Sequence, residues 1–224
     1  MGNRKHIVLD LVVAPEINGY EDLRGKSLAL DALTTGYAFV LFHMMEINGL
    51  PPGSYDMVPV GGTGERLDSL LAGDHVGAVL NPPFVARAVE AGLKVLTSGG
   101  DALDTYQGNT LAASRAWAAE HRAELVSFIR GFLTGLDYLV DPNNAADAAA
   151  ILANNSRDLS ADAATGQIKG LLGKTGFSDK AAIDLDGVRK VLELRSKYGE
   201  PRKELPDPMK YIDLSNYEEA LASL

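Results

Sequence analysis

Apolar and polar positions follow two different periods between residues 27 and 98. Short apolar runs of strand length occur at 27–30, 55–60, 75–81 and 93–99. Between these runs, apolar residues recur three and four positions apart, as in Ala38, Leu41, Phe42 and Met45, which is the spacing of a helix that packs on a sheet. Strands and helices that alternate through short connections predict an α/β fold with a mainly parallel sheet and helices on its faces.

The rest of the chain is predicted to be mostly helical. An apolar run at 6–13 predicts one strand before the alternating region, and GNTLAAS at 108–114 predicts a short strand after it. A long helix is expected from Trp117 to Val140. Its apolar stripe is expected to comprise Leu125, Phe128, Phe132, Leu136 and Leu139. Ser160 and Ser178 are expected to cap short helices, and NYEEALASL to form a terminal helix.

Composition narrows the kinds of partner and chemistry. With 224 residues, the chain is long enough for one large domain or two lobes with a sizeable core. The chain has 30 Asp and Glu against 21 Lys and Arg, a formal charge of −9 without a clustered basic run, so no nucleic-acid partner is expected. The absence of cysteine excludes disulfides, thiolate metal sites and a cysteine nucleophile.

The amino-terminal segment MGNRKHIVLDLVVAPE has a basic start and a short apolar run. Asp10 and Glu16 interrupt this run, and no small-residue cleavage site follows. We therefore expect a strand here and no signal peptide, and a cytoplasmic location if the chain is the complete product. No apolar run reaches the roughly 18 residues of a membrane-spanning helix, so none is predicted.

A small polar cluster stands where the first long helix is predicted to begin, in DALTTGY at 31–37. One interpretation is a capped helix, in which Thr34 or Thr35 accepts a bond from an orphan N–H and Gly36 lets the chain turn closely. The other is a ligand site, because free N–H groups at the positive end of the helix dipole bind carboxylate, sulfonate or phosphate. The residues alone leave both interpretations open, with Asp31 and Tyr37 as the flanking candidates.

Other candidate ligand-binding residues also follow predicted strands, because ligands of open parallel sheets bind at the carboxyl ends of the strands. The candidates at these ends are Gly62, Thr63, Asn81, Pro82 and Pro83. GGTGER at 61–66 lacks the Lys–Ser/Thr of a phosphate loop, so a tight turn is the preferred interpretation there. Tyr106 and Gln107 are further candidates for lining a cleft.

No motif indicates catalysis, a metal or a cofactor. His43 and Glu46 stand three apart on one predicted helix, but no other pair has a metal-binding spacing. The sequence contains no G-x-S-x-G, H-E-x-x-H or paired-glycine fingerprint. We therefore expect no catalytic residue, no bound metal and no cofactor.

The order of these segments resembles a known family, the periplasmic substrate-binding proteins of the nitrate, sulfonate, taurine and thiamine-precursor type, which serve ABC importers. The resemblance lies in YEDLRGKSLALD, TTGYAFVLFHMMEINGL and GGTGERLDSLLAGDHVGAVLNPPFVARAVEAGLKVL. The D-L-x-G-K phrase at 22–26, the polar cluster at the helix start and the strand that ends in Pro-Pro match in order. DPMKYIDLSNYEEAL resembles the closing helix, so the likeness runs from about residue 12 to the end.

This resemblance implies a type II periplasmic binding protein-like fold of two lobes with the ligand between them. Carried over, residues 1–25 are a remaining first-lobe strand and a crossover, 26–99 an α/β lobe, and 100–224 a second crossover and the helical remainder of the first lobe. The cluster at 31–37 would hold an anionic or polar group, with Asn81 to Pro83 across the pocket. The implied ligand is a sulfonate, carboxylate, aromatic acid or pyrimidine, the implied partner an ABC permease, and the implied location the periplasm or cell envelope.

One departure from the family leaves alternatives open. Family members begin with several strand–helix units of the first lobe, of which only the run at 6–13 has a counterpart here. A shortened reading frame, a homodimer in which a second copy covers the missing first-lobe surface, and a rebuilt compact fold each account for this. The alternatives to solute binding are a decarboxylase-like or lyase-like enzyme on the same scaffold, with Asp31, His43 or Glu46 as its base, and an oligomeric interaction protein.

Overall fold

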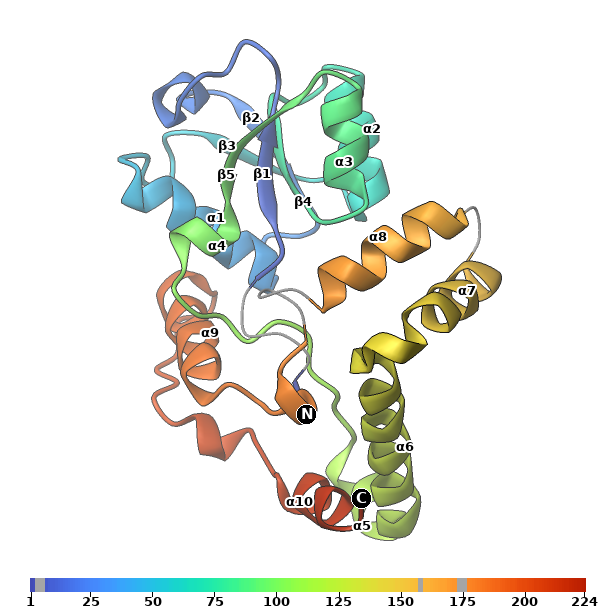
Figure 1. The fold of residues 1–224 in the computed structure, drawn as a ribbon. Coiled ribbons are helices and arrows are strands. Elements are labelled where there is room, and N and C mark those ends of the chain that lie inside the picture. Colours follow the sequence, from blue (N-terminus) through green and yellow to red (C-terminus); the bar gives the residue numbers. More distant parts are fainter. Residues whose placement is uncertain (3–6, 157–158, 173–176) are drawn as a thin grey trace. The chain divides into compact units, whose positions relative to one another are not determined.

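In the computed structural model, which describes residues 1–2, 7–156, 159–172 and 177–224, the alternating region forms a five-stranded sheet of order β3-β2-β4-β1-β5 (Figure 1). The strands are β1 (Asp10–Val13), β2 (Ser27–Leu30), β3 (Asp56–Pro59), β4 (Gly77–Leu80) and β5 (Lys94–Ser98). β2 runs parallel to β3 and β4, whereas β1 runs antiparallel to β4 and β5. The predicted α/β class is confirmed, with β1 as an antiparallel member of the sheet. His6, the first residue of the strand predicted at 6–13, lies outside the described residues.

Contacts divide the chain into two units. Unit 2, which holds the sheet, comprises Ile7–Tyr106 and Arg189–Pro206, and unit 1 comprises Met1–His6, Gln107–Val188 and Asp207–Leu224. Within the described ranges, none of the helices has the length and apolar content needed to cross a bilayer.

Helices cover both faces of the unit 2 sheet because side chains alternate along each strand. The helices are α1 (Gly36–Ile47), α2 (Thr63–Leu71), α3 (Phe84–Glu90) and the short α4 (Gly99–Ala102), and η1 (Tyr20–Leu23) is a single 3₁₀ turn. Leu28 and Leu30 of β2 belong to the core cluster of α1, whereas Ala29 between them belongs to that of α2 and α3. The sheet therefore has a core on each side.

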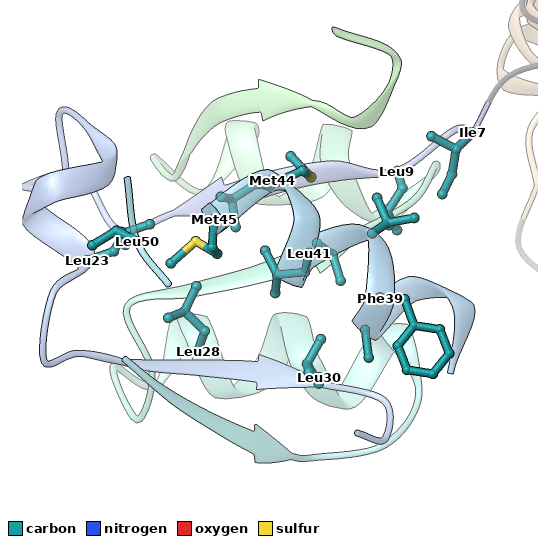
Figure 2. Close-up of a cluster of buried hydrophobic side chains, with 14 of the residues drawn as sticks. Ile7, Leu9, Leu23, Leu28, Leu30, Phe39, Leu41, Met44, Met45 and Leu50 are labelled. Carbon is teal, nitrogen blue, oxygen red and sulfur yellow. The ribbon is translucent and has the colours of Figure 1, made fainter. Parts of the chain in front are cut away.

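The core on the α1 side contains the helix face that the spacing predicts. Ala38, Leu41 and Met45 are fully buried, and Phe42 packs at the edge of the cluster. Figure 2 shows Leu41, Met44 and Met45 of α1 above the leucines of β2. Removing such side chains from water at about 25 cal/mol per Å² is the main stabilisation of this layer.

Glycines end the first three helices of unit 2, as predicted. Asn48 is the C-cap of α1, and Gly49 follows it with φ +84°. Gly73 and Gly92 follow α2 and α3 with φ +77° and +92°. This left-handed region favours glycine, because any Cβ there is close to the carbonyl oxygen.

Unit 1 is mostly helical, as predicted. Its helices are α5 (Arg115–Glu120), α6 (Arg122–Val140), α7 (Ala145–Asn155), α8 (Ala161–Leu171), the start of α9 (Leu185–Tyr198) and α10 (Ser215–Ala222), and its 3₁₀ turns are η2 (Pro142–Asn144), η3 (Asp179–Ala181) and η4 (Pro208–Lys210). The strand predicted at 108–114 is wrong. Thr110 forms only an isolated bridge with Gly2, because the described part of unit 1 provides no sheet for a strand to join.

The single helix predicted from Trp117 to Val140 is also wrong, because the chain leaves helical angles at His121 (φ −123°, ψ 41°) between α5 and α6. The first residue of α6, Arg122, pairs with Glu219 of α10 at 2.5 Å. This contact joins residues 97 positions apart, so hydrophobic periodicity does not reveal it.

The apolar stripe predicted for this helix is confirmed except at Phe128, because Leu136 is buried in the core of unit 1 and Leu125, Phe132 and Leu139 pack against that core. The buried residues of α6 are Val126, Ile129, Leu133 and Leu136. Phe128 of the predicted stripe is 58% exposed, and the prediction omitted Leu133, which is 0% exposed. Two sides of α6 are apolar, and contacts with Ala181 and Ala220 decide which side is the core.

The two predicted serine caps have different outcomes. Ser160 caps α8, since its hydroxyl accepts from the Ala163 N–H at 3.2 Å, which confirms the prediction. Ser178 stands at the N-cap position of η3, as predicted, but its side chain makes no capping bond. Helix periodicity locates a boundary but does not orient the serine side chain.

Candidate functional site

Three helices of unit 2 begin at the edge where the parallel strands end: α1 after β2, α2 after β3 and α3 after β4. Their N-caps are Thr35, Gly62 and Pro83. We call this the strand-end edge. The predicted candidates in its three loops are Asp31, Thr34, Thr35, Gly36, Tyr37, Gly62, Thr63, Asn81, Pro82 and Pro83.

The start of α1 confirms the capped-helix interpretation of the polar cluster and leaves the ligand site a prediction. Thr35 is the cap: its hydroxyl accepts from the Ala38 N–H at 3.1 Å and donates to Asp31 Oδ1 at 2.8 Å. Thr34 is exposed and takes no part in the cap. The N–H groups of Gly36 and Tyr37 donate to no group in the described part of the chain, so two donors remain at the positive end of the α1 dipole.

Tyr106 lies against the start of α1. A Cβ atom at Gly36 would be 2.7 Å from the Tyr106 hydroxyl oxygen, so only glycine allows this close approach. Tyr106 is 7% exposed, and burial, followed by the nearby Tyr37, raises its pKa to about 12. The Tyr106 hydroxyl therefore keeps its proton at neutral pH and stays a hydrogen-bond donor beside the two free amides.

Sequence reasoning missed Arg66, which organises the loop between β3 and α2. Its side chain is 1% exposed and donates from Nε to the Val79 carbonyl (3.1 Å), from Nη1 to the Gly61 carbonyl (2.7 Å) and from Nη2 to Thr63 Oγ1 (3.0 Å). Burial lowers the pKa of Arg66, and the negative charge of Asp31 opposes this effect. The available signal was the position of Arg66 beside Leu67 on the inward face of α2.

Sequence reasoning also missed Asp10. Because β1 runs antiparallel, Asp10 stands opposite Leu80 of β4 and Ser98 of β5, at the strand-end edge. Burial raises the pKa of its carboxyl group; a hydrogen bond from Ser98 opposes this effect and the nearby Asp101 adds to it. The signal was a charged residue inside an apolar run, which we interpreted only as an argument against a signal peptide.

We expect Asp10→Asn to stabilise the protein at neutral pH. A pKa that is higher in the folded than in the unfolded state means that ionising the Asp10 carboxyl group destabilises the folded protein. The free energy of unfolding of the wild type therefore falls as pH rises through the folded pKa. The gain of the variant should therefore shrink as pH falls to the ordinary value of 3.8. Urea unfolding across this pH range measures the difference, with the exposed Asp68→Asn as a control. A variant less stable than the wild type at pH 7 would contradict it.

The remaining predicted residues are placed as follows. The side-chain oxygen of Asn81 is buried and lacks a hydrogen-bond partner, whereas its backbone oxygen accepts from the Phe84 N–H at 2.9 Å. Pro82 and Pro83 form an exposed turn before α3. Gln107 belongs to unit 1, where its Oε1 accepts from the Asp184 N–H at 2.8 Å. Its membership of the site stays a prediction.

The two other candidate bases face α9. Glu46 Oε2 accepts from Lys197 Nζ at 2.9 Å and from the Tyr198 hydroxyl. Burial, followed by the charge of Lys197, lowers the pKa of His43. Both side chains stand two to three turns after the start of α1, roughly 10 Å or more along its axis from Gly36. Within the described ranges, no three potential His, Asp or Glu ligands converge on a common metal position.

Three comparisons relate the chain to known proteins. The NMT1/THI5-like family model matches residues 7–168. No curated protein matches the sequence. Solved structures with similar folds include the ligand-binding component of an ABC-type import system from Staphylococcus aureus, solved with zinc bound, which has TM-score 0.77 and 15% identity over 98% of this chain and 73% of that one.

Two further solved structures share the fold. The periplasmic aliphatic sulphonate-binding protein SsuA from Escherichia coli has TM-score 0.64 and 16% identity over 92% of this chain and 66% of that one. The desulfurization enzyme DSZB has TM-score 0.64 and 14% identity over 100% of this chain and 78% of that one. At such identities the likeness concerns the fold, and fold does not by itself define function.

Proposed function

This chain belongs to the NMT1/THI5-like family, and we propose that it binds a small polar or anionic organic molecule at the strand-end edge of unit 2 for ABC-type uptake. The observation that carries the proposal is the pair of free N–H groups, at Gly36 and Tyr37, that begin the 12-residue helix α1. An anionic oxygen there gains hydrogen bonds and the favourable field of the helix dipole.

The groups around these amides favour a ligand with oxygen acceptors. The Tyr106 hydroxyl adds a donor, and the positive charge of Arg66 interacts with the Asp31 carboxylate and so partly offsets its repulsion of an anion. The Escherichia coli protein of similar fold binds aliphatic sulphonates, which supports the sulfonate class for this chain. Carboxylates, aromatic acids and pyrimidines remain in the proposed range, because each also offers oxygen or nitrogen acceptors to the two amides.

A thermal-shift titration with sulfonates, carboxylates, aromatic acids and pyrimidines tests the proposal. At a ligand concentration of 100 Kd, binding to the folded state alone adds about 2.7 kcal/mol, which raises the melting temperature by several degrees. Gly36→Ala should abolish this shift, because the new methyl group displaces Tyr106 and crowds the amides.

Gly131→Ala is the matched control. Gly131 is an exposed helical glycine whose added Cβ meets no atom within 4 Å, so the ligand-induced shift should persist in this variant. A ligand-induced rise in melting temperature that persists in Gly36→Ala would show that the start of α1 does not bind the ligand. If none of the compounds raises the melting temperature at millimolar concentration, the proposed function is contradicted.

The partner and location proposed for the chain follow from the same function. A solute-binding protein of this kind would deliver its ligand to an ABC permease, in the periplasm or cell envelope. We also propose a second copy of the chain as a partner for α6, whose Phe128 is 58% exposed. Light scattering would detect this homodimer as a doubled mass, and a monomer mass would exclude it.

Binding is proposed in preference to catalysis because of how the candidate bases are engaged. Asp31 is bonded to Thr35, and Glu46 is paired with Lys197. DSZB shows that the fold also occurs in an enzyme. The Thr35 hydroxyl donates to Asp31, but it also accepts from the Ala38 N–H as the cap of α1, so it is engaged in holding the helix start.

A further inference from the structure

The part of α9 that belongs to unit 2 is held against α1 by contacts near its carboxyl-terminal end. The Tyr198 hydroxyl donates to the Glu46 carboxylate, and Lys197 Nζ pairs with the same carboxylate at 2.9 Å. The rings of Phe42 and Tyr198 lie 5.9 Å apart. Leu194 is 1% exposed and belongs to the core cluster of α1. All of these contacts lie within unit 2, so they fix α9 to α1 there.

His43 lies on the same side of α1, and its ring is suited to the neutral state alone. The Nδ1 atom is buried, and nothing in the described ranges is hydrogen-bonded to it. In a neutral imidazole one nitrogen carries no hydrogen, whereas in the protonated ring both nitrogens do. Protonation would therefore bury an N–H group at Nδ1 without an acceptor, which is unfavourable because the lost bond to water is not replaced.

The charges near His43 provide no free counter-ion for a protonated ring. Four charged side chains of α1 and α9 act on it: Lys197, Lys190, Glu193 and Glu46. Each carboxylate is already paired with a lysine, Glu193 with Lys190 at 2.6 Å and Glu46 with Lys197 at 2.9 Å. Burial is the largest cause of the lowered pKa of His43; the two lysines add to it, and the two glutamates oppose it.

The phenols of this contact do not titrate in the same range. Burial, followed by the charge of Glu46, raises the pKa of Tyr55 to about 12. Burial and the hydrogen bond to Glu46 also raise the pKa of Tyr198. Both hydroxyl groups therefore stay protonated around neutral pH, and His43 is the group between α1 and α9 that changes charge there.

From these contacts we propose that His43 is a pH-sensitive switch, whose protonation loosens the unit 2 part of α9 from α1 while the sheet stays folded. A histidine in loosened α9 takes up its proton near the ordinary pKa of 6.5, and the packed state does so only at lower pH. The packing is therefore at full strength above pH 6.5 and weakens as pH falls below it. Because α9 begins in unit 1 and ends in unit 2, the switch acts on a segment that both units share.

Two NMR measurements on the full chain test this proposal. A pH titration of the histidine ring resonances should give His43 a midpoint below 6.5. Amide hydrogen exchange, corrected for the intrinsic effect of pH on exchange, should show severalfold lower protection of residues 192–198 at about pH 5 than at about pH 8. The amides of β2 should keep their protection. The proposal does not depend on the function proposed for the strand-end edge.

Two variants and a matched control connect the response to His43. His43→Gln removes the ionisable ring, so the protection of residues 192–198 should no longer change with pH. Lys197→Met removes a positive charge near the ring and should move the midpoint of His43 upward. His121→Gln makes the same exchange in unit 1, beside Glu124, and should leave the response of α9 as in the wild type.

Three results would overturn the proposal. The first is a midpoint of His43 at or above 6.5. The second is protection of residues 192–198 that either does not change with pH or falls together with that of β2. The third is a wild-type pH response in His43→Gln. The first two are measured on the wild type, so they decide the question even if His43→Gln does not fold.

Discussion

Replacing Arg66 by methionine is expected to lower the free energy of unfolding by about 3 kcal/mol and to weaken ligand binding at the strand-end edge by roughly tenfold. Methionine fills a similar volume, but it leaves the carbonyl oxygens of Gly61 and Val79 without their donor. Each buried acceptor left unpaired costs about 1–3 kcal/mol. The ligand loses affinity because the loop that carries Thr63 is no longer held to β4.

Urea unfolding and a ligand titration of the same samples measure these two effects. Arg66→Lys is an informative second variant, because it keeps the positive charge but cannot donate from a planar fork to three acceptors. We expect it to recover only part of the stability. Arg130→Met, which changes an exposed arginine on α6, is the control. A loss below about 0.5 kcal/mol in Arg66→Met would show that the buried hydrogen bonds contribute little.

Leu133→Ala is expected to destabilise unit 1 by about 2–5 kcal/mol, whereas Phe128→Ala on the same helix should change the stability of the monomer by less than about 0.5 kcal/mol. Leu133 is 0% exposed, so truncating its side chain leaves a cavity in the core against which α6 packs. Phe128 is 58% exposed, so its truncation removes few contacts. The apolar stripe predicted from the sequence includes Phe128 and omits Leu133, so it would give the opposite order: a larger loss of stability in Phe128→Ala than in Leu133→Ala.

The fluorescence of Trp117 measures this difference, because it is the chain's one tryptophan and lies in α5 of unit 1. Denaturant unfolding followed by this signal reports the unit that carries both substitutions, and circular dichroism of each variant before denaturation controls for the starting fold. Equal losses in the two variants would mean that both apolar sides of α6 are covered in solution. A larger loss in Phe128→Ala would restore the stripe predicted from the sequence.

The sequence by itself determined the elements whose stability is local. The apolar run at Ser27–Leu30 became β2 with the same bounds, and the helix that follows begins at Thr35, one of the two predicted caps, and ends before Asn48 and Gly49. These outcomes follow from side-chain period, capping and the φ preference of glycine, which act within a few residues. The loops of the strand-end edge were predicted for the same reason, since parallel strands place the starts of their helices on one side.

Only the tertiary structure decided which distant residues meet. It made β1 antiparallel, which brings Asp10 beside Ser98, and it buried Arg66 against the carbonyl oxygens of Gly61 and Val79. It also selected Leu133 rather than Phe128 for the core of α6 and placed His43 near the charges of α9. Periodicity describes one element at a time, whereas strand direction, burial of a charge and the choice between two apolar faces depend on contacts between elements far apart in the chain.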